Sequence, residues 1–219
     1  AFIHYLDLGL YFNAFDEFVR KTNTNTNAND LFTGIELGPI LAKEGQIENH
    51  LKPGQMVIVQ IVKEPISTKG SRLTAEISLA GRNIVLLPFA KKVSISQKIA
   101  SKEEKKRLET LVRSILPPNY GAIIRTAAEG KNAAILVSEL KSLISKWESS
   151  WTKLSKSKNV QLLFTEYSKT TTILRDLFND SFSNIYVNDQ KEYEEIKKYI
   201  AQISPDKEKI VKFYDGDEP

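Results

Sequence analysis

The chain of 219 residues, of which 41% are hydrophobic and 26% charged, can bury a core as one large domain or two small ones. Because it contains no Cys, disulfides and thiolate metal sites are excluded, and a reducing compartment such as the cytoplasm is expected. The formal net charge of +4 permits binding to a polyanion but does not establish it. The longest apolar runs are far shorter than the roughly 20 residues that span a membrane, and the first residues do not read as a signal peptide.

The first part of the chain predicts a mobile loop followed by a β-hairpin. Residues 21–30 alternate Thr and Asn with almost no apolar side chain, so burial cannot stabilise an ordered structure there. Residues 56–63 are rich in β-branched side chains, and residues 72–79 alternate apolar with polar ones, which is typical of strands. The connecting residues 64–71 carry Lys69, and we therefore expect a hairpin with a basic tip.

From residue 83 onwards, strand and helix patterns alternate. Residues 83–88 form a continuous apolar run that is typical of a strand buried on both faces. Ser101 and Glu104 have the spacing of a capping box, which predicts a helix that begins there and ends near Leu116, before two prolines. The rest of the chain predicts further strands at residues 121–126, 160–165, 184–187 and 209–214, and helices at residues 133–157, 170–179 and 189–203. Such alternation indicates a layered α/β domain.

Cations and aromatic side chains offer candidate contacts to single-stranded RNA, which needs positive charge along its backbone and aromatic faces for its bases. Lysines and arginines are frequent in residues 91–107, but a solvated helix face explains such a segment equally well. Packing in the core is the simpler explanation for each of the amino-terminal aromatic residues taken separately, namely Phe2, Tyr5, Tyr11, Phe12, Phe15 and Phe18. The two widely separated His residues do not indicate a metal site.

Four motifs, in order along the chain, carry a resemblance to a known family. They are KEPISTKGSRLT at residues 63–74, LAGRNIVLLP at 79–88, SQKI at 96–99 and IIRTAAEG at 123–130. In this order and spacing they closely resemble the ribonuclease E/G family, in particular ribonuclease G-like members of the Bacteroidetes type. The resemblance extends over essentially the whole chain.

The resemblance implies an α+β fold in which a partial OB-type β-barrel is joined to an RNase H-like α/β domain. We therefore expect the barrel in residues 1–76, the RNase H-like domain in residues 77–208 and the start of a linker in residues 209–219. In the family, a separate DNase I-like domain holds magnesium through carboxylates, and that domain is expected beyond Pro219. This implies an amino-terminal fragment that binds no magnesium and is inactive alone, whereas homo-oligomers are expected only for the full-length protein.

The resemblance also implies a function: binding of single-stranded RNA and recognition of its 5′-monophosphate, for a magnesium-dependent endoribonuclease of RNA processing and decay. The residues implied in 5′-phosphate binding are Arg125, Thr126, Gly81, Val85 and Lys98, and those implied in RNA binding are Phe2, Lys63 and Lys69. No catalytic or metal-binding residue is implied. An Arg presents a planar fork that matches phosphate oxygens, and a Thr hydroxyl adds a donor. Gln97 and Lys98 stand where E-type members have two Arg, and because an ammonium lacks the two-point geometry, sensing is expected to be weaker.

Two other functions remain open from the sequence. One is a noncatalytic RNA-binding or interaction module without end sensing, since a surface ion pair with Glu129 also explains Arg125 when its motif is taken alone. The other is an autonomous nuclease. That function needs several acidic side chains converging from adjacent strands, and the predicted strands of the α/β domain contain none.

Overall fold

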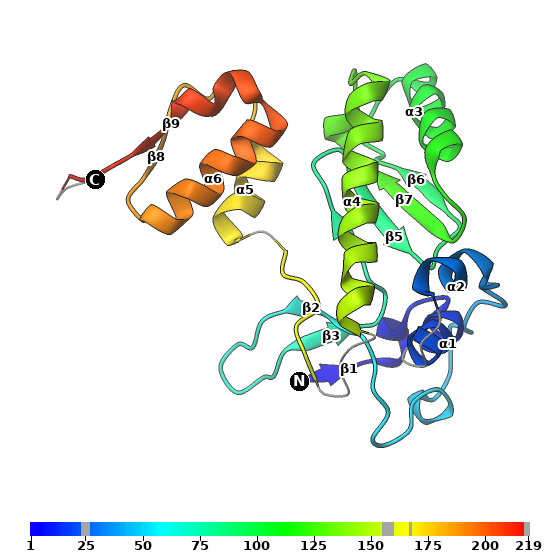
Figure 1. Ribbon diagram of the computed structural model, residues 1–219. Helices are drawn as coiled ribbons and strands as arrows, with labels where there is room; N and C mark the ends of the chain where they lie inside the picture. The colour runs from blue at the N-terminus through cyan, green and yellow to red at the C-terminus, as the bar shows by residue number, and fades with distance from the viewer. Residues whose placement is uncertain (23–26, 155–159, 167, 217–219) are drawn as a thin grey trace. The chain divides into compact units, whose positions relative to one another are not determined.

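The structure, a computed structural model, describes residues 1–22, 27–154, 160–166 and 168–216 (Figure 1). It divides into two compact units, Ala1–Phe164 and Thr165–Pro219, and each unit has a hydrophobic core of its own. Both units mix helices with small sheets, which confirms the α+β class. Of the helices in these described ranges, none combines the length and the apolar composition needed to cross a membrane.

A four-stranded sheet forms the centre of the first unit. Its strands are β4 (Leu79–Ala80), β5 (Ile84–Pro88), β6 (Val93–Ile95) and β7 (Tyr120–Ile124), in the order β4-β5-β7-β6. β5 pairs antiparallel with β4 and β7, whereas β6 pairs parallel with β7. The strands predicted at residues 83–88 and 121–126 are thereby confirmed. The sequence does not predict β6, because three residues beside two lysines show no period to detect.

Two helices cover one face of this sheet. Along β5, Ile84 and Leu86 are fully buried, whereas Val85 between them is half-buried, because successive side chains point to opposite faces. β5 is therefore fully buried on one face only, and the prediction that both of its faces are buried is wrong. Figure 1 shows α4 (Ala133–Leu154) along the buried face, with α3 (Lys102–Ile115) beside it. Each fully buried aliphatic side chain contributes about 1.5–3 kcal/mol relative to exposure, so this face fixes the sheet on its helices.

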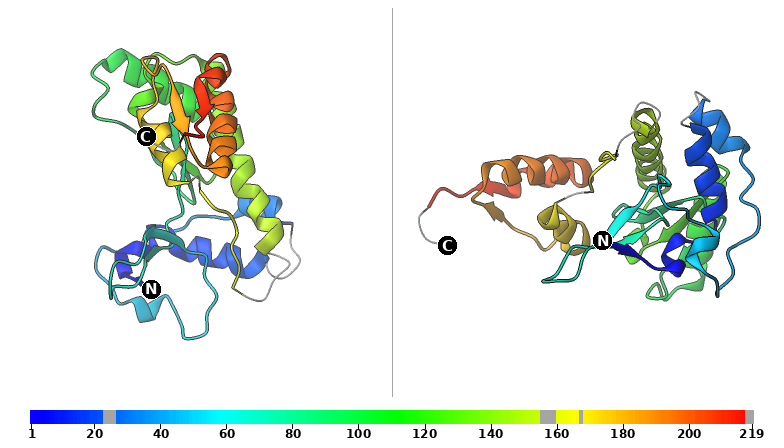
Figure 2. Two further views of the ribbon diagram at one scale, coloured as in Figure 1. Left: turned by 90° about the vertical axis from the view of Figure 1, so that its left-hand side faces the viewer. Right: turned by 90° about the horizontal axis from the view of Figure 1, so that it is seen from below.

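A smaller three-stranded sheet contains the predicted hairpin. β2 (Gln60–Lys63) and β3 (Arg72–Thr74) pair antiparallel, β1 (Phe2–Ile3) pairs parallel with β3, and these described strands form an open sheet. The segment between β2 and β3 extends away from the sheet (Figure 2). Both hairpin strands are shorter than predicted. Beyond Thr74, the amide of Ser78 donates to the side chain of Gln60 and not to a strand backbone.

Two helices near the amino-terminal end correct the prediction of a loop over residues 21–30. α1 (Phe12–Thr22) ends within that segment and α2 (Ala28–Gly34) begins within it, while residues 23–26 lie outside the described residues. The prediction rested on the lack of apolar side chains. Polar side chains order the backbone here instead, because Asn27 caps α2 by accepting a backbone amide two residues further on.

An aromatic cluster joins these helices to the central sheet and to α4. The ring of Phe18 lies 5.7 Å from that of Phe32 and 5.3 Å from those of Phe89 and Trp151, measured between ring centres. Such edge contacts add to the free energy of burial. The same core holds Phe12 and Phe15. These amino-terminal aromatic residues therefore pack internally, and residues from both sides of the predicted division at residue 76 belong to this one core.

The residues after α4 do not form the strand predicted at 160–165. The Leu163 carbonyl accepts a bond from the Lys153 ammonium at the end of α4, and not from a neighbouring strand. Val160 and Leu162 are 90% and 73% exposed. Only Leu163 and Phe164 of this run are partly buried, against the core of the first unit. An apolar run predicts a strand only where a neighbouring strand pairs with it.

The second unit follows the predicted order of helix, strand, helix and strand. Its elements are α5 (Lys169–Leu177), β8 (Ile185–Val187), α6 (Gln190–Ile203), a 3-10 helix (Pro205–Ile210) and β9 (Val211–Phe213). β8 and β9 pair parallel. Ser168 and Asp189 cap the two α-helices, because their side chains accept amides from the first turn. The buried side chains of Leu174, Ile196 and Ile200 form the centre of this unit's core.

One carboxyl of α4 gives the first unit a pH-dependent stability. Burial raises the pKa of Glu148 above its usual value, and nearby Tyr120 acts in the opposite direction. A carboxyl whose pKa is higher in the folded chain than in the unfolded chain stabilises the fold while protonated, and this contribution is lost as the pH rises through the folded pKa. At neutral pH the charged form therefore destabilises the fold.

We expect Glu148→Gln to raise the midpoint of thermal unfolding by a few degrees at pH 7, because the amide carries no charge to desolvate. Circular dichroism melts at pH 7 and pH 4 would measure the effect. The gain should shrink at pH 4, where more of the wild-type carboxyl is protonated. Equal midpoints of the two proteins at pH 7 would contradict a destabilising effect of the buried Glu148 carboxyl.

Candidate functional site

The predicted site residues meet at one edge of the four-stranded sheet. β6 and β7 are parallel neighbours with Ile95 opposite Ile124, so the residues that follow them leave the sheet at the same edge. β5 runs antiparallel to β7 with Ile84 opposite Ile124, which brings the turn at residues 81–83 to that edge as well. Three segments that are distant in sequence therefore converge.

Arg125 joins two of these segments. Its backbone amide donates to the Asn83 carbonyl over 2.8 Å, and its guanidinium Nη1 donates to the Gly81 carbonyl over 3.0 Å. The side chain is half-buried. The guanidinium is thereby held beside the turn, and its planar group has five N–H donors in a fixed arrangement suited to oxyanions.

Thr126 joins the third segment. Its exposed hydroxyl lies 3.1 Å from the hydroxyl of Ser96, and Ser96 Oγ in turn accepts the backbone amide of Lys98 over 3.3 Å. Lys98 is exposed, three residues beyond the end of β6 at this edge. Ser96 is a member of the site to which sequence reasoning gave no role, although it is the first residue of the SQKI motif.

The turn at residues 81–83 is fixed by Glu139 of α4. One carboxylate oxygen of Glu139 accepts the amide of Arg82, and the amide of Asn83 donates to both oxygens over 3.0 and 3.1 Å. A Cβ on Gly81 would meet this carboxylate and would stand 2.8 Å from the Ile84 carbonyl oxygen. A glycine is therefore required here by close approach. No local pattern identifies Glu139, because its partners lie more than fifty positions away.

Val85 lies on the more open face of the sheet. In the register of the strands it is flanked by Ala80 and Ile123, and Ile123 is 39% exposed. This apolar strip begins at Val85, one residue along β5 from Ile84 at the Arg125 edge. It offers a surface on which an apolar or aromatic ring can rest.

Of the three residues predicted to contact RNA, Phe2 and Lys63 lie on strands of the smaller sheet, and Lys69 lies in the loop between β2 and β3. Phe2 is opposite Arg72, and Arg72 is opposite Lys63, so Phe2, Arg72 and Lys63 lie side by side across the three strands. Phe2 is 42% exposed, and Lys63 and Lys69 are exposed. Asp7 orients Arg72 through two bonds of 2.8 and 3.0 Å, and this guanidinium lowers the pKa of the Asp7 carboxyl.

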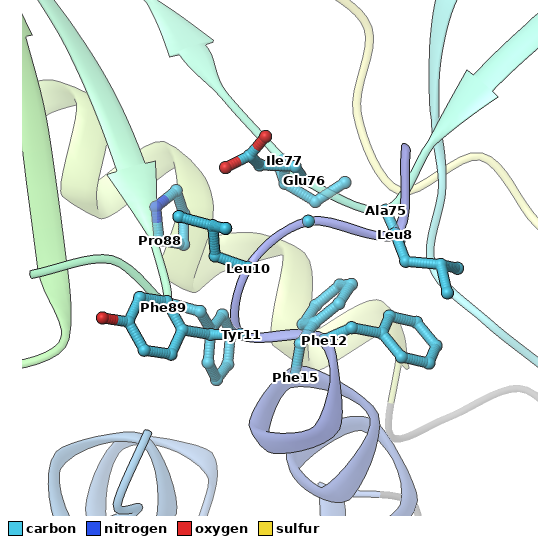
Figure 3. Close-up of a pocket in the computed structure, with 11 residues that line it drawn as sticks. Leu8, Leu10, Tyr11, Phe12, Phe15, Ala75, Glu76, Ile77, Pro88 and Phe89 are labelled. Atoms are coloured by element: carbon cyan, nitrogen blue, oxygen red, sulfur yellow. The ribbon is translucent and has the colours of Figure 1, made fainter. Parts of the chain in front are cut away.

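A separate small cavity of about 20 Å³ lies between the start of α1 and β5 (Figure 3). Its lining is mostly apolar, with Glu76 as its one charged residue, and it includes Pro88 and Phe89, at the opposite end of β5 from Ile84. It contains none of the predicted site residues. An apolar lining does not favour a phosphate, so the Arg125 edge remains the better candidate.

A protein site for a metal ion is usually a cluster of three or more His, Cys, Asp or Glu side chains. Within residues 1–22, 27–154, 160–166 and 168–216 there is none that could hold an ion.

We expect Gly81→Ala to lower the free energy of unfolding by about 1–3 kcal/mol, because the added methyl group overpacks the contact with Ile84 and Glu139. Urea titration would measure the loss. Gly34→Ala is the matched control, since no heavy atom lies within 4 Å of a Cβ at that position. Equal losses in the two variants would show that the turn has room for a side chain.

Comparisons with known proteins identify the family. The sequence matches the Ribonuclease E/G family over residues 78–219. The chain is 34% identical to ribonuclease E of Nostoc sp. over 171 residues, which cover 77% of this chain and 25% of that protein. It is 32% identical to the ribonuclease E/G-like protein of Pyropia yezoensis over 205 residues, covering 90% of this chain and 40% of that protein.

Ribonuclease G of Escherichia coli is a third relative, 32% identical over 173 residues that cover 79% of this chain and 35% of that protein. The chain thus spans between a quarter and two fifths of the length of these relatives. The resemblance carried by the four sequence motifs is confirmed, and the chain belongs to the ribonuclease E/G family.

Proposed function

We propose that this chain is the RNA-binding and 5′-monophosphate-sensing part of a single-strand-specific, magnesium-dependent endoribonuclease of RNA processing and decay, acting in the cytoplasm. In this proposal the partial OB-type barrel is the region of residues 1–76 and the RNase H-like domain is the region of residues 77–208. Magnesium and the catalytic carboxylates belong to other parts of the whole protein, where homo-oligomers also form. The fragment alone binds RNA without cutting it.

The observation that carries the proposal is the convergence of Arg125, Thr126 and the Gly81 turn at one edge. A terminal phosphate has several oxygens in tetrahedral arrangement, so it needs donors from more than one direction. The guanidinium supplies a planar fork from one side and the Thr126 hydroxyl a single donor from the other. The Lys98 ammonium adds a positive charge without fixed geometry.

The apolar strip next to this edge suits the nucleoside that carries the phosphate. Val85 and the exposed Ile123 form a surface on which the terminal base can rest. The rest of the RNA would follow the small sheet and the loop between β2 and β3, where Phe2 can stack on a base while Lys63 and Lys69 neutralise phosphates. This division gives end recognition to one sheet and backbone binding to the other.

The central test compares RNAs that differ only at the 5′ end. We expect a short single-stranded RNA with a 5′-monophosphate to bind more tightly than the same RNA with a 5′-hydroxyl or 5′-triphosphate. Arg125→Ala should weaken binding of the monophosphate about ten- to hundredfold, because charged hydrogen bonds contribute about 1.5–3 kcal/mol each. Fluorescence anisotropy would give the dissociation constants.

Arg113→Ala is the matched control for Arg125→Ala, since Arg113 belongs to the same unit but pairs with Glu109 on α3. Equal affinities for all three RNAs would eliminate end sensing and favour the second candidate, a noncatalytic RNA-binding or interaction module. The same mixtures with Mg²⁺ are analysed on gels. Cleavage by this chain would favour an autonomous nuclease and overturn the proposed division of labour.

A salt titration tests the contacts of the small sheet. We expect Lys63→Ala and Lys69→Ala each to reduce the slope of log affinity against log salt by about 0.7, because each lysine releases one counterion from single-stranded RNA. The loss should be the same for every 5′ end. Lys141→Ala, on the exposed side of α4, should leave the slope unchanged. A slope that is unaffected in the Lys63 and Lys69 variants would place the RNA elsewhere.

A further inference from the structure

The loop of residues 125–131 carries Arg125 and Thr126, and its far end is bonded to α3. The amide of Gly130 donates to a carboxylate oxygen of Glu104 over 2.9 Å. The carbonyl of Lys131 accepts Nη2 of Arg107 over 3.0 Å. One donor and one acceptor of the loop backbone are therefore both bonded to the first turns of the same helix.

Glu104 and Arg107 are also bonded to each other. Two N–H groups of Arg107 donate to the two oxygens of Glu104 over 2.7 and 2.6 Å. Such a two-point contact fixes the plane of both groups. The pair is partly shielded from solvent, since the Glu104 side chain is 18% exposed. The two side chains thus act as one rigid unit that holds Gly130 and Lys131.

Helix capping does not account for this arrangement. The sequence predicts a capping box between Ser101 and Glu104, and half of it is present, because Ser101 Oγ accepts the Glu104 amide over 3.2 Å. In the other half, the Glu104 carboxylate would reach back to the helix start. It is directed to Gly130 and Arg107 instead. The Glu104 carboxylate therefore stabilises the loop at Gly130 and not the first turn of α3.

Consecutive tight turns connect the bonded end of the loop to the proposed phosphate site. The amide of Ala128 donates to the Arg125 carbonyl, that of Glu129 to the Thr126 carbonyl, and that of Lys131 to the Ala128 carbonyl, over 3.0–3.1 Å. At its other end the loop is fixed by the bond from the Arg125 amide to Asn83. Thr126 therefore lies between two fixed points.

We propose that Glu104 and Arg107 are positioning residues for the 5′-phosphate site, which set the affinity for a terminal phosphate by fixing the 125–131 loop without touching the RNA. The inference rests on the proposed function of Arg125 and Thr126. The bonds from Arg107 and Gly130 lower the pKa of Glu104 to about 2, so the carboxylate stays charged and the contact persists across the physiological pH range. The bonding geometry and the charged state of Glu104 therefore both support a stable contact with the loop.

The test measures discrimination, defined as the dissociation constant for a 5′-hydroxyl RNA divided by that for the same RNA with a 5′-monophosphate. We expect Glu104→Ala to lower discrimination about tenfold, because a loosened loop loses the alignment of charge-assisted bonds. Glu104→Gln keeps an acceptor for Gly130 but loses the charge, so its discrimination should lie between those of wild type and Glu104→Ala. Amide hydrogen exchange at Gly130 should be faster in both variants.

Glu109→Ala is the matched control. Glu109 pairs with Arg113 on the same helix over 2.8 and 2.9 Å, and its described bonds stay within α3. It should leave discrimination within about twofold of wild type, given the small contribution of exposed ion pairs. Because the ratio divides out a general loss of folded protein, a purely structural role of Glu104 would lower both affinities equally.

The outcomes separate the two hypotheses. If wild type binds both RNAs equally, the proposed function fails. If wild type discriminates and Glu104→Ala discriminates equally well, the positioning role fails while the proposed function stands. Faster exchange at Gly130 together with unchanged discrimination would also overturn the positioning role, because the loop would then be loosened without consequence for the phosphate.

Discussion

The parallel pairing of β6 with β7 is the constraint on which the rest of the candidate site depends. Because the two strands run in the same direction, with Ile95 opposite Ile124, both carboxyl ends open onto one edge of the sheet. α3 and α4 begin just beyond that edge, so the positive ends of both helix dipoles lie on the side where the Arg125 guanidinium is held. An antiparallel β6 would place Ser96 at the other end of the sheet and leave Thr126 without its hydroxyl neighbour.

Two carboxylates stand close to residues that we propose bind an anion, and both are engaged by the backbone. Glu139 accepts the amides of the 81–83 turn, and Glu104 accepts the amide of Gly130 together with the Arg107 fork. An isolated carboxylate would repel a phosphate bound nearby. A carboxylate that accepts several N–H groups has its charge partly compensated, and it can then anchor a turn. The two acids thereby fix the segments that carry the cationic and hydroxyl groups.

The sequence predicts the elements that depend on local residue patterns, but it does not predict the residues whose roles depend on contacts between distant segments. The strand at β5, the helix α3 and the motif around Arg125 follow from hydrophobic period, capping residues and motif order, and all are present. Glu139 and Glu104 were missed as partners of the site, because their bonds join distant segments and leave no periodic signal. α2 was missed because order in its first turn comes from a polar cap, whereas the prediction considered burial alone.

The hydrogen bonds around Ser96 bear on how Thr126 would meet a phosphate. Ser96 Oγ accepts the Lys98 amide, so its own proton is directed elsewhere, and the neighbouring oxygen is that of Thr126 at 3.1 Å. If Ser96 donates to Thr126, the Thr126 oxygen has an acceptor position filled and its proton points away from Ser96, towards solvent. Each bond in such a chain polarises the next and strengthens the outermost donor. With the bond in this direction, the Thr126 proton would be available to an incoming phosphate oxygen.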